Sequence, residues 1–192
     1  MNLESLALAQ TALNQKSGLD LASTAALEER VTELFRLLYR PVFRYVLTIL
    51  GDCGLAEDVT QDVFLRLFRS LSKGEVIRNL RAWVFQVAYR LTMDVLRANR
   101  KMGLLQEDQA ARVLEKKPDA AANPEQRLLQ QEQKNQLLAA WSLLSPQEQH
   151  CLSLRSEGLT YGEIASVLGI RSSSVGNFLA RGIGKIRRAS HD

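Results

Sequence analysis

The sequence predicts an all-α protein of two small helical domains joined by a flexible linker, with a helix-turn-helix in the C-terminal domain. Apolar residues recur at steps of three and four over most of the chain, and no segment alternates with the period of a strand for long enough to matter. A stretch with two prolines and no apolar anchor, residues 116–124, separates two such helical blocks. A chain of 192 residues has room for two small cores.

The domain boundaries follow from where the helical period is lost and regained. Residues 1–25 are polar and weakly amphipathic, and we expect an N-terminal extension there. The first domain is expected over residues 26–101, the linker over residues 102–123 and the second domain over residues 124–192.

The first domain is expected to contain a long helical segment followed by two further helices. A strong helical period over residues 27–50 is interrupted at Pro41. The proline predicts either a kink or two abutting helices, with Pro41 in the first turn of the second. The remaining boundaries are expected to be a turn at 51–54, a helix over 56–71, a break at 72–75 and a helix over 80–100.

Polar side chains occupy the outer face of the helix expected over residues 56–71. They are Asp58, Gln61 and Asp62, beside Leu65. Paired carboxylates serve acid–base catalysis or metal binding only within a concave pocket, which a solvent-facing helix does not offer. We therefore expect no catalytic residue and no metal ligand here. Two interpretations stay open, a solvated surface and an acidic docking face for a partner protein.

The helix expected over residues 80–100 carries charges and aromatic rings together. Its charged stripe is spaced by four, three and four residues and consists of Arg90, Asp94, Arg97 and Lys101. Flat rings beside guanidinium groups favour a single-stranded nucleic-acid site, where each stacked base gains ~1–3 kcal/mol. A solvated face with weak ion pairs is the alternative. Phe85 is expected in the core, whereas Trp83 and Tyr89 fit either role.

The second domain is expected to begin with a helix over residues 124–144. Ser145, Pro146 and Glu148 then form a helix start signal, with serine as the N-cap, proline at the first position and glutamate at the third. The helix that they open is expected to end at Gly158.

Residues 160–175 have the pattern of a helix-turn-helix, which places its second helix in the DNA major groove. Ile164 and Ala165 belong to one apolar helical face, and Gly169 supplies a left-handed residue at the helix end. The three serines before Val175 are expected to cap the second helix.

The outer face of that second helix presents polar and basic side chains. They are Ser173, Ser174, Gly176, Asn177 and Arg181, followed by Lys185, Arg187 and Arg188. Asparagine and arginine pair bidentately with adenine and guanine edges, and the trailing basic residues suit phosphates. A basic C-terminal tail without function is the alternative.

Composition argues against several classes of protein. The net charge of +4 is ordinary for a soluble protein. Cys53 and Cys151 lack metal-site spacing and are expected to be small buried residues in a reducing cytoplasm. His150 and His191 are the two histidines, both expected at the surface, which disfavours an enzyme. We expect no signal peptide, and no apolar run approaches the roughly 20 residues of a membrane span.

The two helical blocks together resemble the extracytoplasmic-function (ECF) group of bacterial RNA polymerase sigma factors, over roughly residues 31–101 and 124–189. The first block carries Leu38-Tyr39 ahead of Pro41, then Ala56-Glu57-Asp58, Gln61, Phe64, Arg81-Ala82-Trp83, Asp94 and Leu96-Arg97. The second carries Leu144-Ser145-Pro146, the run from Gly158 to Ile170, Val175 and Leu179. The resemblance implies a cytoplasmic, non-enzymatic protein without a cofactor that binds core RNA polymerase, promoter DNA in duplex and melted form, and an anti-sigma factor.

The resemblance also implies roles for particular residues. Polymerase docking falls to Asp58, Gln61, Asp62, Leu65 and Phe68. Recognition and melting of the minus-ten element, including capture of a flipped base by the loop over residues 71–79, falls to Lys73, Arg78, Asn79, Arg81, Trp83, Tyr89, Arg90, Arg97, Arg100 and Lys101. Recognition of the minus-thirty-five element falls to Arg171, Ser172, Ser173, Ser174, Gly176, Asn177, Arg181 and Lys185.

Two departures from the family pattern bear on these roles. Tyr89-Arg90 stands where the family usually has Arg-Asn, so we expect different minus-ten contacts. The recognition helix has few cations and two added glycines, Gly176 and Gly182, each costing about 1 kcal/mol of helix propensity. We therefore expect weaker upstream binding with a shallow salt dependence.

A helix-turn-helix transcriptional regulator, or a helical adaptor that is no polymerase subunit, is the alternative function.

Overall fold

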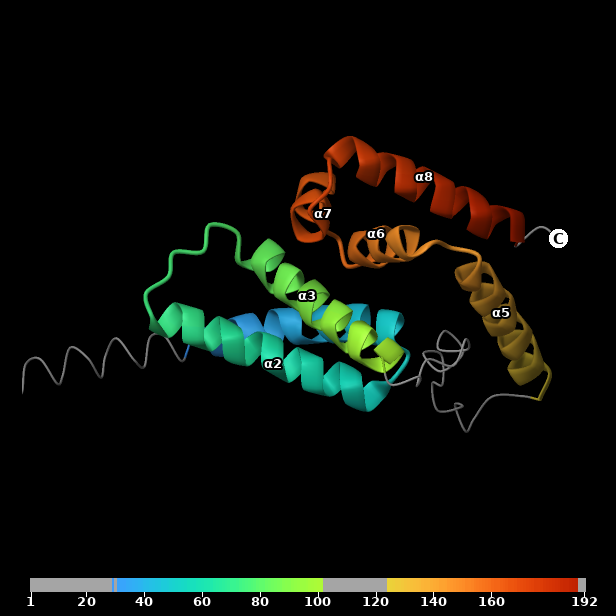
Figure 1. Cartoon of the computed structure of the whole chain (residues 1–192). Helices are drawn as coiled ribbons and strands as arrows, with labels where there is room; N and C mark the ends of the chain where they lie inside the picture. The colour runs from blue at the N-terminus through green and yellow to red at the C-terminus, as the bar shows by residue number, and fades with distance from the viewer. Residues whose placement is uncertain (1–28, 30, 102–123, 190–192) are drawn as a thin grey trace, which may run out of the picture.

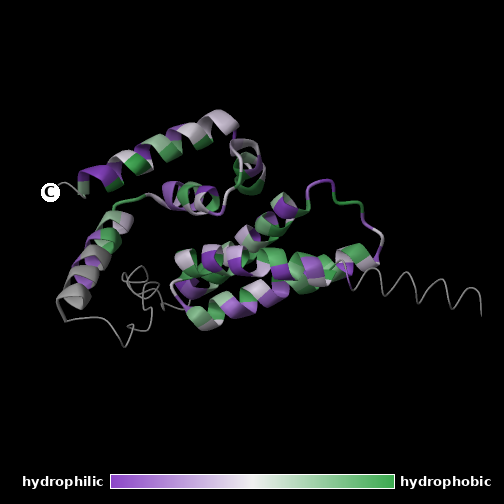
Figure 2. Ribbon diagram, turned by 180° about the vertical axis from the view of Figure 1, so that it is seen from behind, coloured by the Kyte–Doolittle hydropathy of each residue, from purple (hydrophilic) through white to green (hydrophobic). Residues whose placement is uncertain are grey.

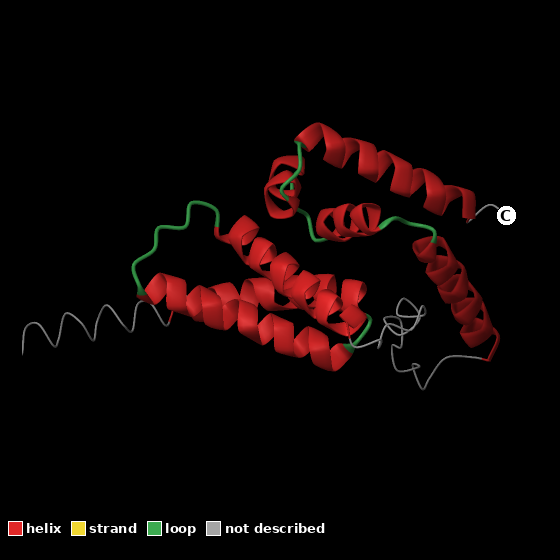
Figure 3. Ribbon diagram, viewed as in Figure 1, coloured by secondary structure: helices red, strands yellow, loops and turns green. Residues whose placement is uncertain are grey.

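The computed structural model describes residues 29, 31–101 and 124–189. Throughout these residues the regular secondary structure is helical, which confirms the all-α prediction (Figure 3). The expected N-terminal extension over residues 1–25 and the expected linker over residues 102–123 lie outside the described residues, as does His191.

The first domain packs a helix over residues 31–50 against α2 (Cys53–Ser72) and α3 (Leu80–Lys101) (Figure 1). The chain is helical without interruption through Pro41, so the proline does not divide the segment into two helices. Val42 and Val46, just after the proline, are completely buried. Their packing outweighs the one backbone hydrogen bond that proline removes.

Amphipathic helices build the core of this domain. Apolar and polar residues alternate around each helix (Figure 2), as expected when one face is buried. The tightest part of the core is at most 1% exposed, and its larger apolar side chains are Val42, Tyr45, Val46, Val63, Leu67, Val84 and Phe85. Phe85 therefore has the core position predicted for it.

The turn before α2 is shorter than predicted. Gly51 adopts a left-handed backbone with φ 69°. Asp52 then caps α2, because its side chain accepts a hydrogen bond from the Leu55 N–H at 2.9 Å. Cys53 and Gly54 thus lie within the helix rather than in a turn. Cys53 is exposed, contrary to the prediction, because it is the first residue of α2, whereas Cys151 is buried as predicted.

The second domain contains α5 (Pro124–Ser142), α6 (Pro146–Ser156), α7 (Tyr161–Leu168) and α8 (Ser172–Ala189). Ser145 and Glu148 form the predicted capping box at the start of α6. Thr160 and Glu163 form a second capping box at the start of α7, and Gly169 ends that helix with the predicted left-handed backbone, φ 68°.

The serines before Val175 do not cap α8 from outside. The helix begins at Ser172, so all three lie in its first turn, and the N–H groups of Ser174 and Val175 donate to the Arg171 carbonyl. The prediction placed the helix start too late, because a run of serines is as compatible with a first helical turn as with a cap.

Gly182, which was expected only to lower the stability of the helix, has a role in packing. It is buried in α8, and a Cβ built there would lie 2.8 Å from Leu152 Cδ1 and 3.6 Å from Glu148 Cβ. The glycine lets α8 approach α6 closely. By contrast, a Cβ on Gly184 would meet nothing within 4 Å.

The two domains pack against each other. α7 lies beside the N-terminal part of α3, whereas α8 lies on the side of the second domain away from α3 (Figures 1 and 2). One apolar cluster runs through both domains and joins Phe85 and Leu91 of α3 to Leu154, Leu159 and Ile164 of the second domain.

Candidate nucleic-acid interface

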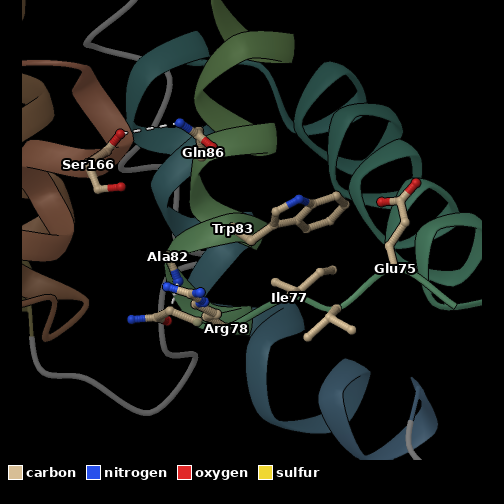
Figure 4. A pocket seen from close by; sticks show the side chains of 9 residues that line it. Glu75, Ile77, Arg78, Ala82, Trp83, Gln86 and Ser166 are labelled. Atoms are coloured by element: carbon tan, nitrogen blue, oxygen red, sulfur yellow. Dashed lines mark hydrogen bonds between the residues drawn. The ribbon is translucent and has the colours of Figure 1, made fainter.

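A pocket of about 350 Å³ opens between the loop after α2 and the first turns of α3. Its volume is within the range of sites that hold small organic groups. Nine residues line it, namely Glu75, Val76, Ile77, Arg78, Asn79, Ala82, Trp83, Gln86 and Ser166 (Figure 4). Three of the residues predicted to contact the minus-ten element thus share one pocket, and Ser166 of α7 forms part of its wall.

The local sequence sets the shape of this pocket. Gly74, with φ 75°, turns the chain out of α2. The Asn79 side chain accepts from the Ala82 N–H at 2.9 Å, which fixes the start of α3. Trp83 follows one residue later and is half-buried, with its indole ring turned toward the loop that carries Ile77 (Figure 4). An aromatic ring and an arginine in one pocket are suited to stack a nucleobase and to hold its phosphate.

Basic side chains continue along α3 beyond the pocket. Exposed members of this row are Arg90, Arg97, Arg100 and Lys101, and Lys73 is exposed at the end of α2. Arg97 pairs with Asp94 at 2.8 Å, both side chains being more than 60% exposed. A pair so exposed is worth little, so it leaves Arg97 available to a phosphate.

The outer face of α2 is acidic and partly apolar. Asp58, Gln61 and Asp62 are exposed as predicted, and next to them Leu65 is 51% and Phe68 38% exposed. Apolar side chains left in water beside polar ones are typical of a surface that meets a protein partner. Among the described residues, no His, Cys, Asp and Glu side chains gather into a possible metal site.

The outer face of α8 carries most of the predicted duplex-reading residues. Arg171, Ser172, Ser173, Asn177 and Arg181 are exposed, and Ser174 and Gly176 are partly so.

Lys185 is placed differently from the rest of that set. Its Nζ donates to the Glu148 carboxylate at 2.8 Å and to the Leu143 carbonyl at 3.1 Å. Burial raises the pKa of Glu148, but its bonds to Lys185 and the Ser145 N–H outweigh this and hold the pKa below its usual value. Lys185 therefore ties α8 to the start of α6.

Polar contacts between the domains involve two predicted minus-ten residues. The Asn79 amide donates to Glu163 at 3.1 Å, and Arg81 donates to the Glu157 carbonyl. Gln86, beside the pocket, donates to the Ser166 carbonyl at 3.3 Å. The sequence had predicted DNA roles for Asn79 and Arg81, but nothing in it indicated these partners.

Arg44 and Glu157 form an ion pair between the domains. Arg44 Nε lies 3.0 Å from Glu157 Oε1, and Arg44 Nη2 lies 2.6 Å from Glu157 Oε2. The bidentate bond raises the pKa of Arg44. The Glu157 side chain is only 7% exposed, although that of Arg44 is 62% exposed.

His150 is buried in this interface, contrary to the prediction that it lies at the surface. Its Nδ1 is 3.0 Å from the hydroxyl of Tyr45, and the ring of Tyr89 packs edge-on at 5.1 Å between centroids. Burial lowers the pKa of His150 to about 4. Polar neighbours in sequence concealed this burial, which comes from contact with the other domain.

Comparison with known proteins shows which family has this arrangement. Residues 34–102 match the model of sigma-70 region 2, and residues 134–186 match that of sigma-70 region 4. The chain is 31% identical to the ECF RNA polymerase sigma factor SigL of Mycobacterium tuberculosis over 150 residues, which cover 74% of this chain and 80% of the relative. The chain belongs to the ECF sigma factors.

Other relatives of this ECF sigma factor differ in length. It is 28% identical to SigE of Mycolicibacterium smegmatis and 28% identical to BldN of Streptomyces coelicolor, over 81% and 79% of its own length. The alignments span 59% and 56% of those relatives.

Solved structures of sigma factors share the fold. The sigma factor RpoE of Bartonella quintana, solved with the anti-sigma factor NepR, superposes with a TM-score of 0.64 at 16% identity, over 83% of this chain and 96% of that one. CnrH, solved with the cytosolic domain of CnrY, gives 0.59 at 16% identity over 84% and 87%. No helix in the described part of this sigma factor is both long and apolar enough to cross a membrane.

Proposed function

We propose that this chain binds core RNA polymerase and directs it to a set of promoters. It reads the minus-ten element with its first domain and the minus-thirty-five element with its second. One observation carries the proposal. Matches to sigma-70 regions 2 and 4 occur in order on one chain, the first containing an aromatic and basic pocket and the second a helix-turn-helix.

The α2 face is the proposed docking surface for polymerase. Leu65 and Phe68 supply apolar contact area, and Asp58, Gln61 and Asp62 supply charge and hydrogen bonds around it. Such a mixture of an apolar centre and a polar rim is the usual anatomy of a protein interface.

The pocket and α3 are the proposed site for the melted minus-ten strand. Trp83 stacks a base turned out of the duplex, and Asn79 reads its edge. Arg78, Lys73 and the exposed basic residues of α3 hold the backbone on either side.

The outer face of α8 is the proposed reader of the minus-thirty-five duplex. Asn177 and Arg181 have the donor and acceptor groups that pair with adenine and guanine in the major groove. Because Lys185 is bound to Glu148, this face offers fewer cations to phosphates than its sequence suggests. Upstream binding should therefore be weak and only mildly sensitive to salt.

Regulation by an anti-sigma factor is part of the proposal. Two sigma factors with this fold have been solved with partners, the anti-sigma factor NepR in one case and the cytosolic domain of CnrY in the other. We propose that this protein acts in the cytoplasm through binding alone, with the chemistry of RNA synthesis left to the polymerase.

Run-off transcription tests the proposed function. Core polymerase is mixed with this chain and with fragmented DNA of its own genome, and the 5′ ends of the transcripts are mapped. We expect discrete start sites that are absent with core polymerase alone. Transcripts unchanged by the chain, together with no binding to core polymerase in gel filtration, would contradict the proposal. A chain carrying Leu65→Arg and Phe68→Arg is the matched control, expected to lose core binding while keeping its fold.

A further inference from the structure

The contacts between the two domains involve Asn79, which the proposed function assigns to the minus-ten strand, and Arg81, to which the family resemblance gives the same role. Asn79, at the pocket, donates to Glu163. Arg81, in the first turn of α3, donates to the Glu157 carbonyl. In each case an oxygen of the second domain accepts a hydrogen bond from a side chain that could otherwise donate to DNA.

Glu157 adds a second contact of the same kind. Its carboxylate holds Arg44 through two parallel hydrogen bonds at 3.0 and 2.6 Å. This fork geometry is the one by which arginine also binds a phosphate. Glu157 is 7% exposed, so its charge is withdrawn from water and depends on Arg44 for compensation.

The pocket itself is partly closed from the same side. Ser166 of α7 lines it, and its carbonyl accepts from Gln86 at 3.3 Å (Figure 4). A DNA strand that leaves the pocket along α3 would run into α7. The strand and α7 therefore compete for one surface.

We propose that Glu157 and Glu163 act as an internal latch, which holds the chain in a closed state that masks the pocket and the first turns of α3 and must open before the melted minus-ten strand binds. This inference rests on the proposed function for the identity of the nucleic acid. The closure itself is a property of the chain alone. The outer face of α8 takes no part in these contacts and stays accessible while the latch is closed.

Reversal of the Glu157 charge tests the latch. Glu157→Lys places two cations against each other at the Arg44 contact, with no hydrogen bond of α6 or α7 removed. Glu132→Lys is the matched control, because Glu132 is exposed on α5 and the substitution changes the net charge equally. The double variant with Arg44→Glu and Glu157→Lys restores the pair with its charges exchanged.

Two measurements are made on the full chain. Energy transfer between dyes on cysteines at Ala98 and Arg187, in a Cys53→Ser background, reports domain separation; both positions carry exposed or partly exposed side chains on different domains, and Cys151 is buried. Fluorescence anisotropy with single-stranded DNA of random sequence reports access to the pocket, since base stacking is tolerant of sequence.

We expect Glu157→Lys to lower energy transfer and to bind the single strand about tenfold more tightly than Glu132→Lys, with the exchanged pair returning both values toward the unmodified chain. Equal energy transfer in Glu157→Lys and Glu132→Lys would overturn the latch, as would opening without tighter single-strand binding. If Glu157→Lys loses helical circular dichroism, Arg44→Glu is judged by energy transfer against the unmodified chain, because its charge change is opposite to that of Glu132→Lys. Energy transfer needs neither polymerase nor promoter, so its result is distinguishable from failure of the run-off experiment.

Discussion

The two surfaces that we propose to read DNA differ in their contacts within this sigma factor. On the first domain, Asn79 and Arg81 already bond to oxygens of the second domain, and Ser166 stands at the edge of the pocket. On the second domain, Asn177 and Arg181 are exposed on α8, and this helix lies on the side of the domain away from α3 (Figure 1).

Because of this difference, only one of the two proposed kinds of DNA binding requires the domains to separate. Duplex binding through α8 requires no separation of the domains. On our proposal, binding of a melted strand through α3 requires the loss of the Arg44–Glu157 pair and of the apolar contact between α3 and α7. On the proposed function, closure therefore opposes capture of the single strand and leaves the duplex-binding face of α8 accessible.

Of the substitutions considered, Trp83→Ala should have the largest effect, and it should weaken single-strand binding by the first domain without affecting duplex binding by the second. Trp83→Ala should weaken single-strand binding by about ten- to a hundredfold, because a stacked base gains ~1–3 kcal/mol. Trp141→Ala, the same truncation on α5, is the control and should leave that affinity unchanged. Anisotropy with single-stranded and duplex probes measures both. Equal losses on the two probes would mean that Trp83 supports the fold rather than the site.

Enlargement of Gly182 should damage the second domain and its reading helix. Gly182→Val places atoms against Leu152 and should lower the free energy of unfolding by about 1–3 kcal/mol in urea denaturation. Gly184→Ala, two residues on, meets open space and should raise it by up to about 1 kcal/mol. If both substitutions stabilise the domain, the close approach of α6 and α8 is wrong.

Acid should open the domains through His150. While the domains are closed, the His150 ring stays neutral, with a pKa of about 4. In an open chain its pKa returns toward 6.5. The open state thus binds the proton first, and closure is lost as pH falls below 6.5, at up to about 1.4 kcal/mol per pH unit. Tyr45 and Tyr89 face the ring, and burial keeps the pKa of Tyr45 well above this range.

Energy transfer measured between pH 6.5 and pH 5 isolates this effect, because the pKa of Glu163 is lowered from 4.5 and its carboxylate stays charged there. The dependence of energy transfer on pH should vanish in His150→Gln. A slope that persists in this variant would assign the acid response to another group.

Loss of one cation from α8 should have the smallest effect. Arg181→Ala should weaken binding to random duplex DNA and reduce the slope of log affinity against log salt by about one. Lys185→Ala should change that slope less, since Lys185 is bound to Glu148. Equal changes in slope would show that Lys185 leaves Glu148 for the DNA.

Local patterns in the sequence predicted most of the helices. The capping box at Ser145 and the left-handed Gly169 are encoded by neighbouring residues, so both were predictable. The start of α2 was misplaced because Asp52 caps it and takes two residues from the expected turn. The start of α8 was misplaced because serine is common both at the N-cap and in the first turn of a helix, so the run of three serines does not show which residue begins the helix.

The relation between the domains could not be predicted from local patterns. Glu163 appears in the sequence as a residue three positions after Thr160, which predicts a cap and says nothing of Asn79. His150 lies among polar residues and is buried only because Tyr45 and Tyr89 cover it. The exposed faces of α2 and α8 were predictable, since helical periodicity alone indicates which side of a helix is outward.

Energy transfer in the doubly labelled chain, on addition of core RNA polymerase, tests the central claim most directly. If the chain is a sigma factor whose minus-ten surface is masked by its own second domain, core polymerase should lower energy transfer at once, and the Leu65→Arg and Phe68→Arg chain should not respond. Energy transfer that stays unchanged at saturating core polymerase would contradict the account.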